Sequence, residues 1–352
     1  MKKTILASAI AAATFSGAAL AQESNLPTVY GNIQYALSYE NFDEGPSEVD
    51  HFDNGSTLGV AHSHEIAPGI TGFFKMELEG INADDKAKSS GIDKLDEAYI
   101  GVKGDSFGQV WVGSDDSTYE SAIEVIGNFY EVGGYNLAGG YDTGEGDLIQ
   151  YMSPSFGGLK LAAAVQVNGD SKEGGKSYPY QLAAIYSVDA LELAFAMDSN
   201  DGKLKYSSNG LDDSGAQDLS GNNENTYGLR ATYNLDNLSL TAQFQTRKDV
   251  EDKFGLMGVY TLGKNQFALS YERSEADGDL NALKAGDQDV KDIVTIQALH
   301  NLSDNMYVYV EGYFAGGDQV HQWDSNGDDK ITDADFATDE KTLAAVGAVY
   351  YF

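Results

Sequence analysis

Short segments in which apolar and polar side chains alternate recur along the whole chain, and they constrain its fold more than any other feature. Within residues 29–39, for example, Ile33 and Leu37 fall on one side of an extended chain, whereas Asn32 and Gln34 fall on the other. Successive side chains of a β-strand point to opposite faces of the sheet, so such a segment has one apolar and one polar face. The alternation predicts strands that separate lipid from water.

Sixteen segments of this kind are predicted as strands. They cover residues 29–39, 57–63, 70–79, 97–103, 109–114, 147–153, 159–168, 180–187, 191–197, 226–235, 238–247, 254–262, 266–273, 291–301, 306–314 and 341–352. Beyond the N-terminal segment no run of about 18 apolar residues occurs, which excludes a transmembrane helix. A closed β-barrel is the other structure that pairs every backbone polar group inside a bilayer. The sequence therefore predicts an all-β fold, a 16-stranded antiparallel transmembrane β-barrel.

The N-terminus has the pattern of an export signal. Lys2 and Lys3 precede an apolar run over residues 5–15, and an Ala-Leu-Ala sequence that ends at Ala21 offers small residues for cleavage. We expect residues 1–21 to be a signal peptide, cleaved after Ala21. Residues 22–352 are then expected to form one barrel domain in the cell outer membrane.

Composition agrees with a barrel and excludes other classes of protein. The 40 glycines and 22 tyrosines suit tight turns and aromatic girdles, and only 5 prolines interrupt the strands. The absence of cysteine excludes a disulfide framework and thiolate chemistry. A formal net charge of −33 argues against nucleic acid as a partner and favours cations near the surface.

Connector lengths alternate between short and long. Short turns are predicted near residues 67–69, 105–108, 154–158, 236–237, 263–265 and 303–305. Long acidic loops are predicted near 41–54, 81–95, 115–146, 198–223, 274–290 and 315–340. Short periplasmic turns and long extracellular loops are the asymmetry expected of an outer-membrane barrel.

Several motifs occur in a fixed order along the chain. They are Val-Tyr-Gly-Asn at 29–32, Glu-Ala-Tyr-Ile-Gly-Val-Lys-Gly at 97–104, Phe-Gly-Gln-Val at 107–110, Tyr-Met-Ser-Pro-Ser-Phe-Gly-Gly at 151–158, and a last strand that ends in Phe352. Together they resemble the general porin family of Gram-negative outer membranes. The resemblance implies a homotrimeric, non-enzymatic channel for small hydrophilic solutes and ions. It also implies contacts with outer-membrane lipid and lipopolysaccharide, and recognition of Phe352 by the barrel-assembly machinery.

The resemblance further implies that the third long loop, residues 115–146, folds inward and narrows the pore. Its acidic residues are Asp115, Asp116, Glu120, Glu124, Glu131, Asp142 and Glu145. No Lys or Arg occurs between Lys103 and Lys160. A wholly acidic loop in a constriction attracts cations and repels anions, so we predict a cation-preferring pore. The alternative is that these acids lie on outer loops and leave the conductance unselective.

The basic residues that relatives place on the facing wall are poorly matched in this chain. Asn32, Thr57 and Ser114 stand where such relatives commonly have cationic residues, which puts the usual transverse field in doubt. By strand parity, the inward bases of the constriction are predicted to be Lys75, Lys103, Lys160 and Arg230. The inward acids opposite them are predicted to include Glu77, Glu272 and Glu311.

The last long loop carries a second candidate site. Counted from Asp324, oxygen ligands fall at Asp324, Asn326, Asp328, Thr332 and Asp335, and Lys330 supplies a backbone carbonyl at position 7. This spacing resembles the EF-hand, and especially the dockerin-type loop, and predicts a structural calcium site. Asp329 replaces the usual glycine at position 6, and Asp335 is shorter than the usual glutamate. The alternative is a solvated, Asp-rich loop tip.

Other sites and classes are weaker. Residues 104–108 match G-x-S-x-G, but they lie between two predicted strands, whereas a nucleophile elbow joins a strand to a helix. His62 and His64 share one side of a strand without an evident third ligand, a pattern more typical of a surface or interface than of zinc. A barrel protease or lipase would need a catalytic dyad or triad, and a calcium-dependent adhesin or structural barrel remains the other alternative.

Overall fold

The computed structural model describes residues 26–85, 87, 91–92, 94–133, 140–141, 143–167, 178–201, 224–276, 290–323 and 336–352. Within these ranges the helical segments are α2 (Thr118–Ile123) and the 3-10 helix η1 (Gly127–Phe129). No helix in the described part of the chain is long and apolar enough to cross a membrane. The predicted signal peptide and the predicted calcium ligands at 324–335 lie outside the described residues, as does Asp142.

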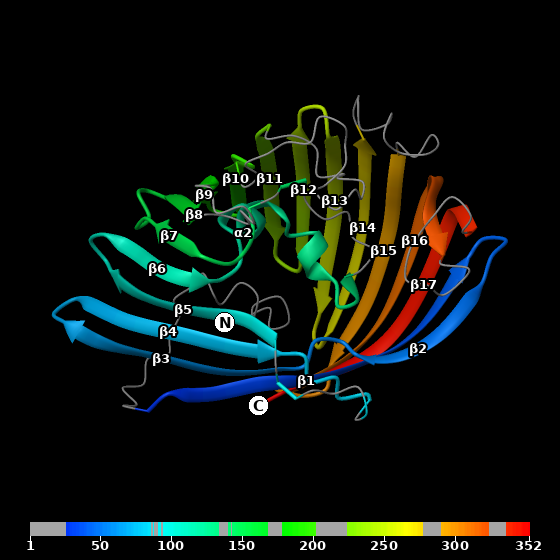
Figure 1. The fold of residues 1–352 in the computed structure, drawn as a ribbon, viewed down its shortest axis with the longest axis horizontal. Coiled ribbons are helices and arrows are strands. Elements are labelled where there is room, and N and C mark those ends of the chain that lie inside the picture. The colour runs from blue at the N-terminus through cyan, green and yellow to red at the C-terminus, as the bar shows by residue number, and fades with distance from the viewer. Residues whose placement is uncertain are drawn as a thin grey trace.

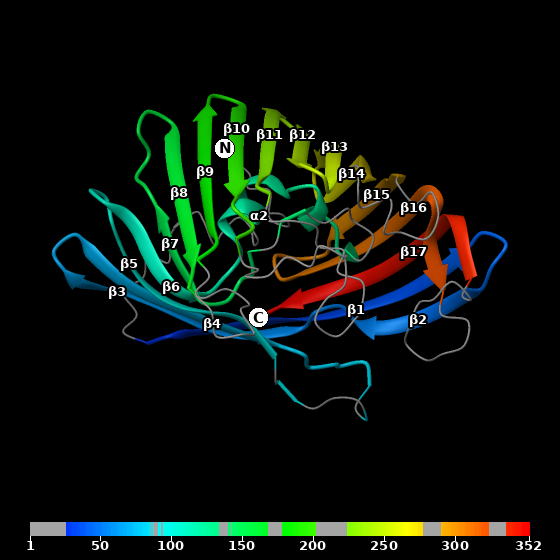
Figure 2. The ribbon, with the colours of Figure 1, turned by 45° about the horizontal axis from the view of Figure 1, so that its top comes forward.

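Strands make up nearly all of the rest. They are β1 (Thr28–Phe42), β2 (Ser47–Asp53), β3 (Thr57–Ala67), β4 (Ile70–Glu79), β5 (Lys94–Gly104), β6 (Gly108–Ser114), β7 (Leu148–Met152), β8 (Leu159–Gln166), β9 (Tyr180–Val188), β10 (Leu191–Asp198), β11 (Thr226–Leu235), β12 (Leu238–Arg247), β13 (Glu251–Leu262), β14 (Asn265–Ala276), β15 (Val290–Asn301), β16 (Met306–Trp323) and β17 (Phe336–Tyr351). Figures 1 and 2 show these strands curving around a central space that contains α2.

The sheet closes because β1 has a partner on each side. It pairs antiparallel with β17, from Asn32 opposite Tyr351 to Phe42 opposite Lys341. On its other side, β1 pairs with β3 in its first part and with β2 in its second part. Because β2 and β3 share this neighbour, the seventeen segments occupy sixteen positions in the wall. The predicted 16-stranded antiparallel barrel is confirmed.

The wall has two chemically different faces. On β11, the outward Leu229 and Tyr233 are 55% and 46% exposed, whereas the inward Thr226 and Arg230 are buried. Exposed tyrosines also lie near the strand ends at the short turns, among them Tyr186, Tyr260 and Tyr350. An apolar band with aromatic residues near its border is the surface that lipid covers on a membrane barrel.

Several strands extend beyond their predicted ends. The prediction that residues 41–54 form a loop was wrong for Ser47–Asp53, which form β2 and pair with β1. Likewise β5 begins at Lys94, and β16 and β17 extend into the predicted loop 315–340. These extensions are rich in acidic and other polar residues and lack the lipid-water alternation. Backbone pairing continues there without a lipid-facing side, so the periodic signal is lost while the strand persists.

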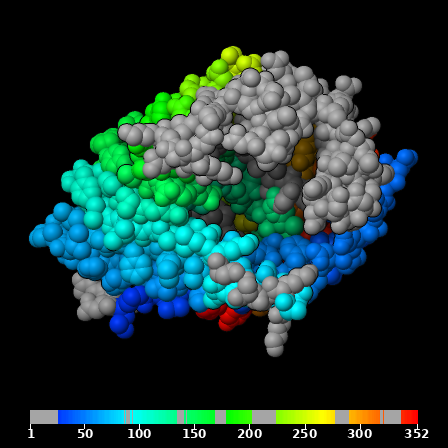
Figure 3. Space-filling model, viewed as in Figure 1, coloured from blue at the N-terminus to red at the C-terminus, as the bar shows by residue number. Residues whose placement is uncertain are grey.

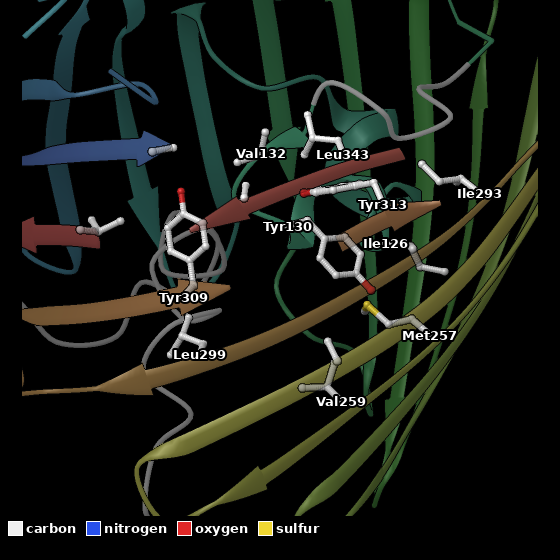
Figure 4. Close-up of a cluster of buried hydrophobic side chains, with 14 of the residues drawn as sticks. Ile126, Tyr130, Val132, Met257, Val259, Ile293, Leu299, Tyr309, Tyr313 and Leu343 are labelled. Carbon is white, nitrogen blue, oxygen red and sulfur yellow. The ribbon is translucent and has the colours of Figure 1, made fainter. Parts of the chain in front are cut away.

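The largest buried cluster lies inside the barrel. Ile126, Tyr130 and Val132 of the loop that follows α2 contact inward side chains of the wall, as Figure 4 shows. The wall residues of this cluster include Met257, Val259, Ile293, Leu299, Tyr309, Tyr313 and Leu343. Since apolar burial is the main favourable term in packing, this contact seats the loop against β13 to β17.

Candidate functional site

Residues 115–133 lie between β6 and β7 in the sequence and run along the inner face of the wall. We call them the constriction segment. The backbone N–H of Asp115 donates to the carbonyl of Glu145 at 3.0 Å and closes the base of the loop. The Ser117 hydroxyl accepts from the N–H of Glu120 at 3.0 Å, which caps the start of α2. The helix then packs against β9, β10 and β11 (Figure 1).

The wall is shaped and charged to receive α2. The Tyr119 hydroxyl donates to Gln245 Oε1 at 2.9 Å, and Arg230 Nε donates to the carbonyl of Ala122 at 2.7 Å. Gly228 leaves room for the helix, because a Cβ at that position would lie 2.7 Å from side-chain atoms of Tyr119 and Ile123. The helix therefore needs both an inward Arg and an inward Gly on β11.

Glu311 of β16 holds the tip of the constriction segment. Its carboxylate accepts from the backbone N–H of Glu131 at 2.9 Å and of Val132 at 3.0 Å. The Tyr313 hydroxyl and the Gln297 amide donate to the same carboxylate at 2.7 and 2.8 Å. Hydrogen bonds to an ionised acceptor are about twice as strong as neutral ones, so this single side chain is a strong anchor.

Two further residues of the wall also hold the tip. Asn54, which lies between β2 and β3, donates from Nδ2 to the carbonyl of Glu131 at 2.8 Å. The Tyr307 hydroxyl of β16 donates to Glu131 Oε1 at 2.8 Å. Elements at both ends of the chain therefore fix the loop across the interior. Figure 3 shows a hollow near the centre of the molecule, with atoms coloured as this loop and the far wall visible at depth.

Five of the seven predicted loop acids lie in the constriction segment, and their environments differ. Asp116 is exposed, and Glu120 is half-buried and accepts from Asn128 at 2.9 Å and from the Tyr141 hydroxyl at 2.7 Å. The other three turn toward protein. Asp115 accepts from Trp111 Nε1 at 2.6 Å, Glu124 is buried, and Glu131 lies in the tip contacts.

Desolvation raises the pKa of three of these acids, and together with the charges of Glu120 and Glu97 it raises the pKa of Asp116 to about 8. It raises the pKa of Asp115 to about 7, helped by the charge of Glu97 and opposed by the Trp111 hydrogen bond. It also raises the pKa of Glu131 to about 7, helped by Glu311 and opposed by the Tyr307 hydroxyl. These groups therefore change charge near neutral pH, unlike a carboxyl in water.

Two of the four predicted constriction bases are paired with wall acids. Lys75 forms an ion pair with Glu97 and a longer one, at 3.5 Å, with Glu77. Arg230 forms an ion pair with Glu192 at 2.7 Å. Pairing reduces the positive field that each base projects into the lumen.

The other two predicted bases and the predicted wall acids lie elsewhere. Lys103 has its Nζ 5.8 Å from the ring centroid of Phe73, and Lys160 is exposed on β8. The predicted wall acids Glu272 and Glu311 are only 2% and 1% exposed. They therefore face the buried loop contacts and not open water.

A further set of wall bases was missed by the sequence analysis. Arg247, Lys253, Lys291 and Lys341 lie at inward positions of β12, β13, β15 and β17. Lys253 and Lys291 stand on either side of Ser274 in the strand register. Lys253 lies just before the predicted strand at 254–262, whereas Arg247, Lys291 and Lys341 are end residues of predicted strands, where strand parity already places them on the inner face. Lys253 forms an ion pair with Glu251 at 3.2 Å, and Lys341 forms one with Glu40.

Metal ligands do not cluster in the described part of the chain. Among those residues no group of three or more His, Cys, Asp or Glu side chains is arranged to hold a metal ion. His62 and His64 stack with their ring centroids 5.2 Å apart on the outer face of β3, beside Ile66 and Phe74. The predicted calcium ligands lie outside the described residues.

We predict that Glu311→Ala releases the tip of the constriction segment. Two backbone N–H groups lose a charged acceptor, and each such bond contributes about 1.5–3 kcal/mol. Amide hydrogen exchange of residues 126–132, followed by mass spectrometry, should accelerate by at least about tenfold.

The matched control is Glu275→Ala, which removes an exposed acid whose nearest ion pair, with Arg273, is 3.9 Å long. This variant should leave exchange in the loop unchanged. Equal exchange in Glu311→Ala and in the unchanged protein would contradict the anchoring role.

Solved structures with the same fold include an anion-selective porin and an outer membrane protein in a trimer form. The anion-selective porin from Comamonas acidovorans matches with a TM-score of 0.67 at 18% identity, over 93% of this chain and 99% of that one. A trimer form of OmpT, an outer membrane protein of Vibrio cholerae, matches with a TM-score of 0.62 at 14% identity, over 93% and 99% of the two chains. At these identities the likeness shows the fold alone.

Sequence comparison gives the family. A monosaccharide porin from a Halomonas species is 33% identical over 299 residues, which cover 79% of this chain and 72% of that protein. Residues 7–319 match the Gram-negative porin family. With its closed barrel and inward loop, the chain belongs to the Gram-negative porin family and is an outer-membrane channel for small solutes.

Proposed function

We propose that this channel is a water-filled diffusion pore that prefers cations over anions. The observation that carries the preference is the position of Asp116 and Glu120 on the constriction segment, where neither side chain is fully buried and neither has a basic partner among the described residues. Carboxylates at a narrow, low-dielectric site attract cations and repel anions.

The distribution of bases supports the same preference. Lys75 and Arg230, the predicted bases with ion pairs, each have an acid within contact distance. Their fields are therefore partly cancelled, whereas Asp116 and Glu120 act on passing ions directly. The alternative, an unselective pore, would follow if the wall bases Lys253, Lys291 and Lys341 balance the loop acids.

Uncharged solutes should pass as well. We infer that sugars of monosaccharide size are among them, because the relative from Halomonas is a monosaccharide porin and is 33% identical. Selection among neutral solutes in a wide pore depends on size, so this inference and the cation preference are independent of each other.

Assembly and membrane partners form the next part of the proposal. We infer a homotrimer, supported by the trimer form of the OmpT neighbour, and contacts with lipopolysaccharide around the loops. We also infer that the barrel-assembly machinery recognises Phe352. Its backbone pairs with Gly31 through bonds of 3.0 and 3.2 Å, while 55% of its surface stays exposed and accessible to a partner.

A structural calcium ion in the last long loop is the final part. The proposal rests on sequence spacing alone, with Asp324, Asn326, Asp328, Lys330, Thr332 and Asp335 as ligands. Such an ion would stiffen the loop and would not take part in chemistry. The ligand set is rich in hard oxygen donors, which suits calcium better than transition metals.

We predict stepwise conductance in planar bilayers and a cation-preferring reversal potential in a salt gradient. Asp116→Asn combined with Glu120→Gln should lower the cation-to-anion permeability ratio, because two carboxylates leave the constriction. Glu44→Gln combined with Glu48→Gln removes the same charge from exposed positions at β2 and its turn and should change the ratio far less. Absence of conductance steps from folded protein would refute the channel, and anion preference would refute the selectivity.

We predict that the cation preference weakens as the pH falls. Asp115 and Asp116 have pKa values raised to about 7 and to about 8, so each is charged above its pKa and neutral below it. Reversal potentials measured from about pH 9 down to about pH 5.5 should therefore shift toward a less selective pore. Asp115→Asn combined with Asp116→Asn should flatten this part of the curve. A preference that grows on acidification would contradict the assignment.

We predict that isothermal calorimetry detects calcium binding with a Kd on the order of 10⁻⁴–10⁻³ M. Asp324→Ala combined with Asp328→Ala should abolish the heat, because two of the proposed ligands are lost. Asp212→Ala combined with Asp213→Ala removes equal charge from another acidic loop and should leave binding intact. Equal heats in both double variants would end the calcium proposal.

A further inference from the structure

The second position of the barrel wall is broken between β2 and β3. Residues 54–56 interrupt the strand. β1 spans the gap, because its residues 28–32 pair with β3 and its residues 35–41 pair with β2. The break is well fastened to Gln34 of β1, whose Nε2 donates to the Gly55 carbonyl and whose N–H donates to Ser56 Oγ, both at 2.9 Å. The break is therefore a defined structure and not a frayed end.

On the inner face, the break contacts the constriction segment. Asn54 Nδ2 donates to the carbonyl of Glu131 at 2.8 Å and lies 3.4 Å from the Tyr309 hydroxyl. Glu131 is the residue whose N–H is bound by Glu311 of β16, and β17 and β1 lie between β16 and the break in the wall. Asn54 is thus the contact that joins the tip to the break.

On the outer face, the same break contacts the loop between β4 and β5. The Asp53 carboxylate accepts from the N–H of Ala83 at 2.8 Å, and the N–H of Asp53 donates to Asp84 Oδ1 at 3.1 Å. The Tyr35 hydroxyl donates to the carbonyl of Ala83. The Tyr35 ring stacks on His51 of β2, with centroids 5.2 Å apart and planes 9° apart.

Asp53 and Asn54 are consecutive residues whose side chains reach opposite faces of the wall, because Asp53 binds Ala83 of the outer loop and Asn54 binds Glu131 of the constriction segment. The Asp53 carboxylate also accepts from the N–H of Ser56 at 2.8 Å, which ties the outer contact to the geometry of the break itself. A change in the position of residues 82–84 therefore acts on the same short backbone segment that orients Asn54.

We propose that the break at residues 53–56 couples the outer-face loop at 82–84 to the constriction segment, with Asn54 as the positioning residue of the loop tip. Only the consequence of this coupling, the control of pore width, rests on the proposed pore function. The coupling itself is a property of the hydrogen-bond network. A contact that moves the outer loop would release the tip and widen or destabilise the constriction.

The test uses the absence of cysteine from the chain. Val132→Cys places a single thiol at the tip, at a position only 7% exposed, and its rate of reaction with a maleimide reports release of the tip. Asn54→Ala should raise this rate by about fivefold, the shift in population that one hydrogen bond supports. Asn32→Ala removes an amide hydrogen bond of 2.9 Å to Thr57 without contacting the loop, and should leave the rate unchanged.

The coupling is tested with substitutions on the outer face, again with the labelling rate of the thiol at position 132 as the measurement. Tyr35→Phe keeps the ring on His51 but removes the hydroxyl that binds Ala83, and it should also raise the labelling rate. Tyr39→Phe, on the same outer face of β1, should not. When Tyr35→Phe is added to Asn54→Ala, the rate should not rise further, because the connection is already cut.

The proposal would be overturned if Tyr35→Phe left the labelling rate unchanged. It would also be overturned if Tyr35→Phe raised the labelling rate by the same factor whether residue 54 is Asn or Ala. Heat-modifiable mobility in gels confirms that each variant is a folded barrel, and Tyr35→Phe is conservative enough to carry the test if Asn54→Ala folds poorly. Labelling needs no ion current. A barrel that fails to conduct but shows the coupling would refute the pore function and leave this inference intact.

Discussion

The pairing of β1 with β17 is the interaction on which the rest of the structure depends. A sheet left open would expose two rows of unpaired backbone groups, each costing several kcal/mol within hydrocarbon. The register that joins Asn32 to Tyr351 and Phe42 to Lys341 removes both edges at once. Closure also creates an interior that lipid cannot reach, so inward residues such as Arg230 and Gln243 can be polar without penalty from the membrane. The outer face is free to be apolar for the same reason.

A closed wall of this size would enclose more space than its own side chains fill, and the constriction segment occupies part of it. The segment carries its own small core, Ile126, Tyr130 and Val132, into the lumen and packs it on the wall. Hydrogen bonds then fix the position of the tip, which apolar packing alone would not determine. Glu311 binds two backbone N–H groups of the tip and is itself held by Tyr313 and Gln297. The four donors offset the cost of removing this carboxylate from water, and they give the tip one position.

The fold followed from the sequence because the lipid-water boundary imposes a period of two on every strand that crosses it. Where that boundary ends, the signal ends, and this is why β2 was predicted as part of a loop although it pairs with β1. The same error hid Lys253, which lies in β13 but just before the predicted start of that strand at residue 254. The candidate site was less accessible to sequence reasoning. All five loop acids look alike in the sequence, whereas Asp116 is exposed and Glu124 is buried against the wall, a distinction set by tertiary contacts alone.

Some acidic and some basic side chains of the inner wall lie on different groups of strands. Glu77, Glu97 and the base of the constriction segment lie on one side of the strand order, and Lys253, Lys291 and Lys341 lie on strands β13 to β17. The wall has no bases at Asn32, Thr57 and Ser114 but carries positive charge on strands β13 to β17. Fields between separated charges are screened within about 8 Å at physiological salt, so the groups nearest the constriction contribute most to the potential there. In this chain those groups include Asp116 and Glu120 of the constriction segment, and also Arg230, which donates to the carbonyl of Ala122.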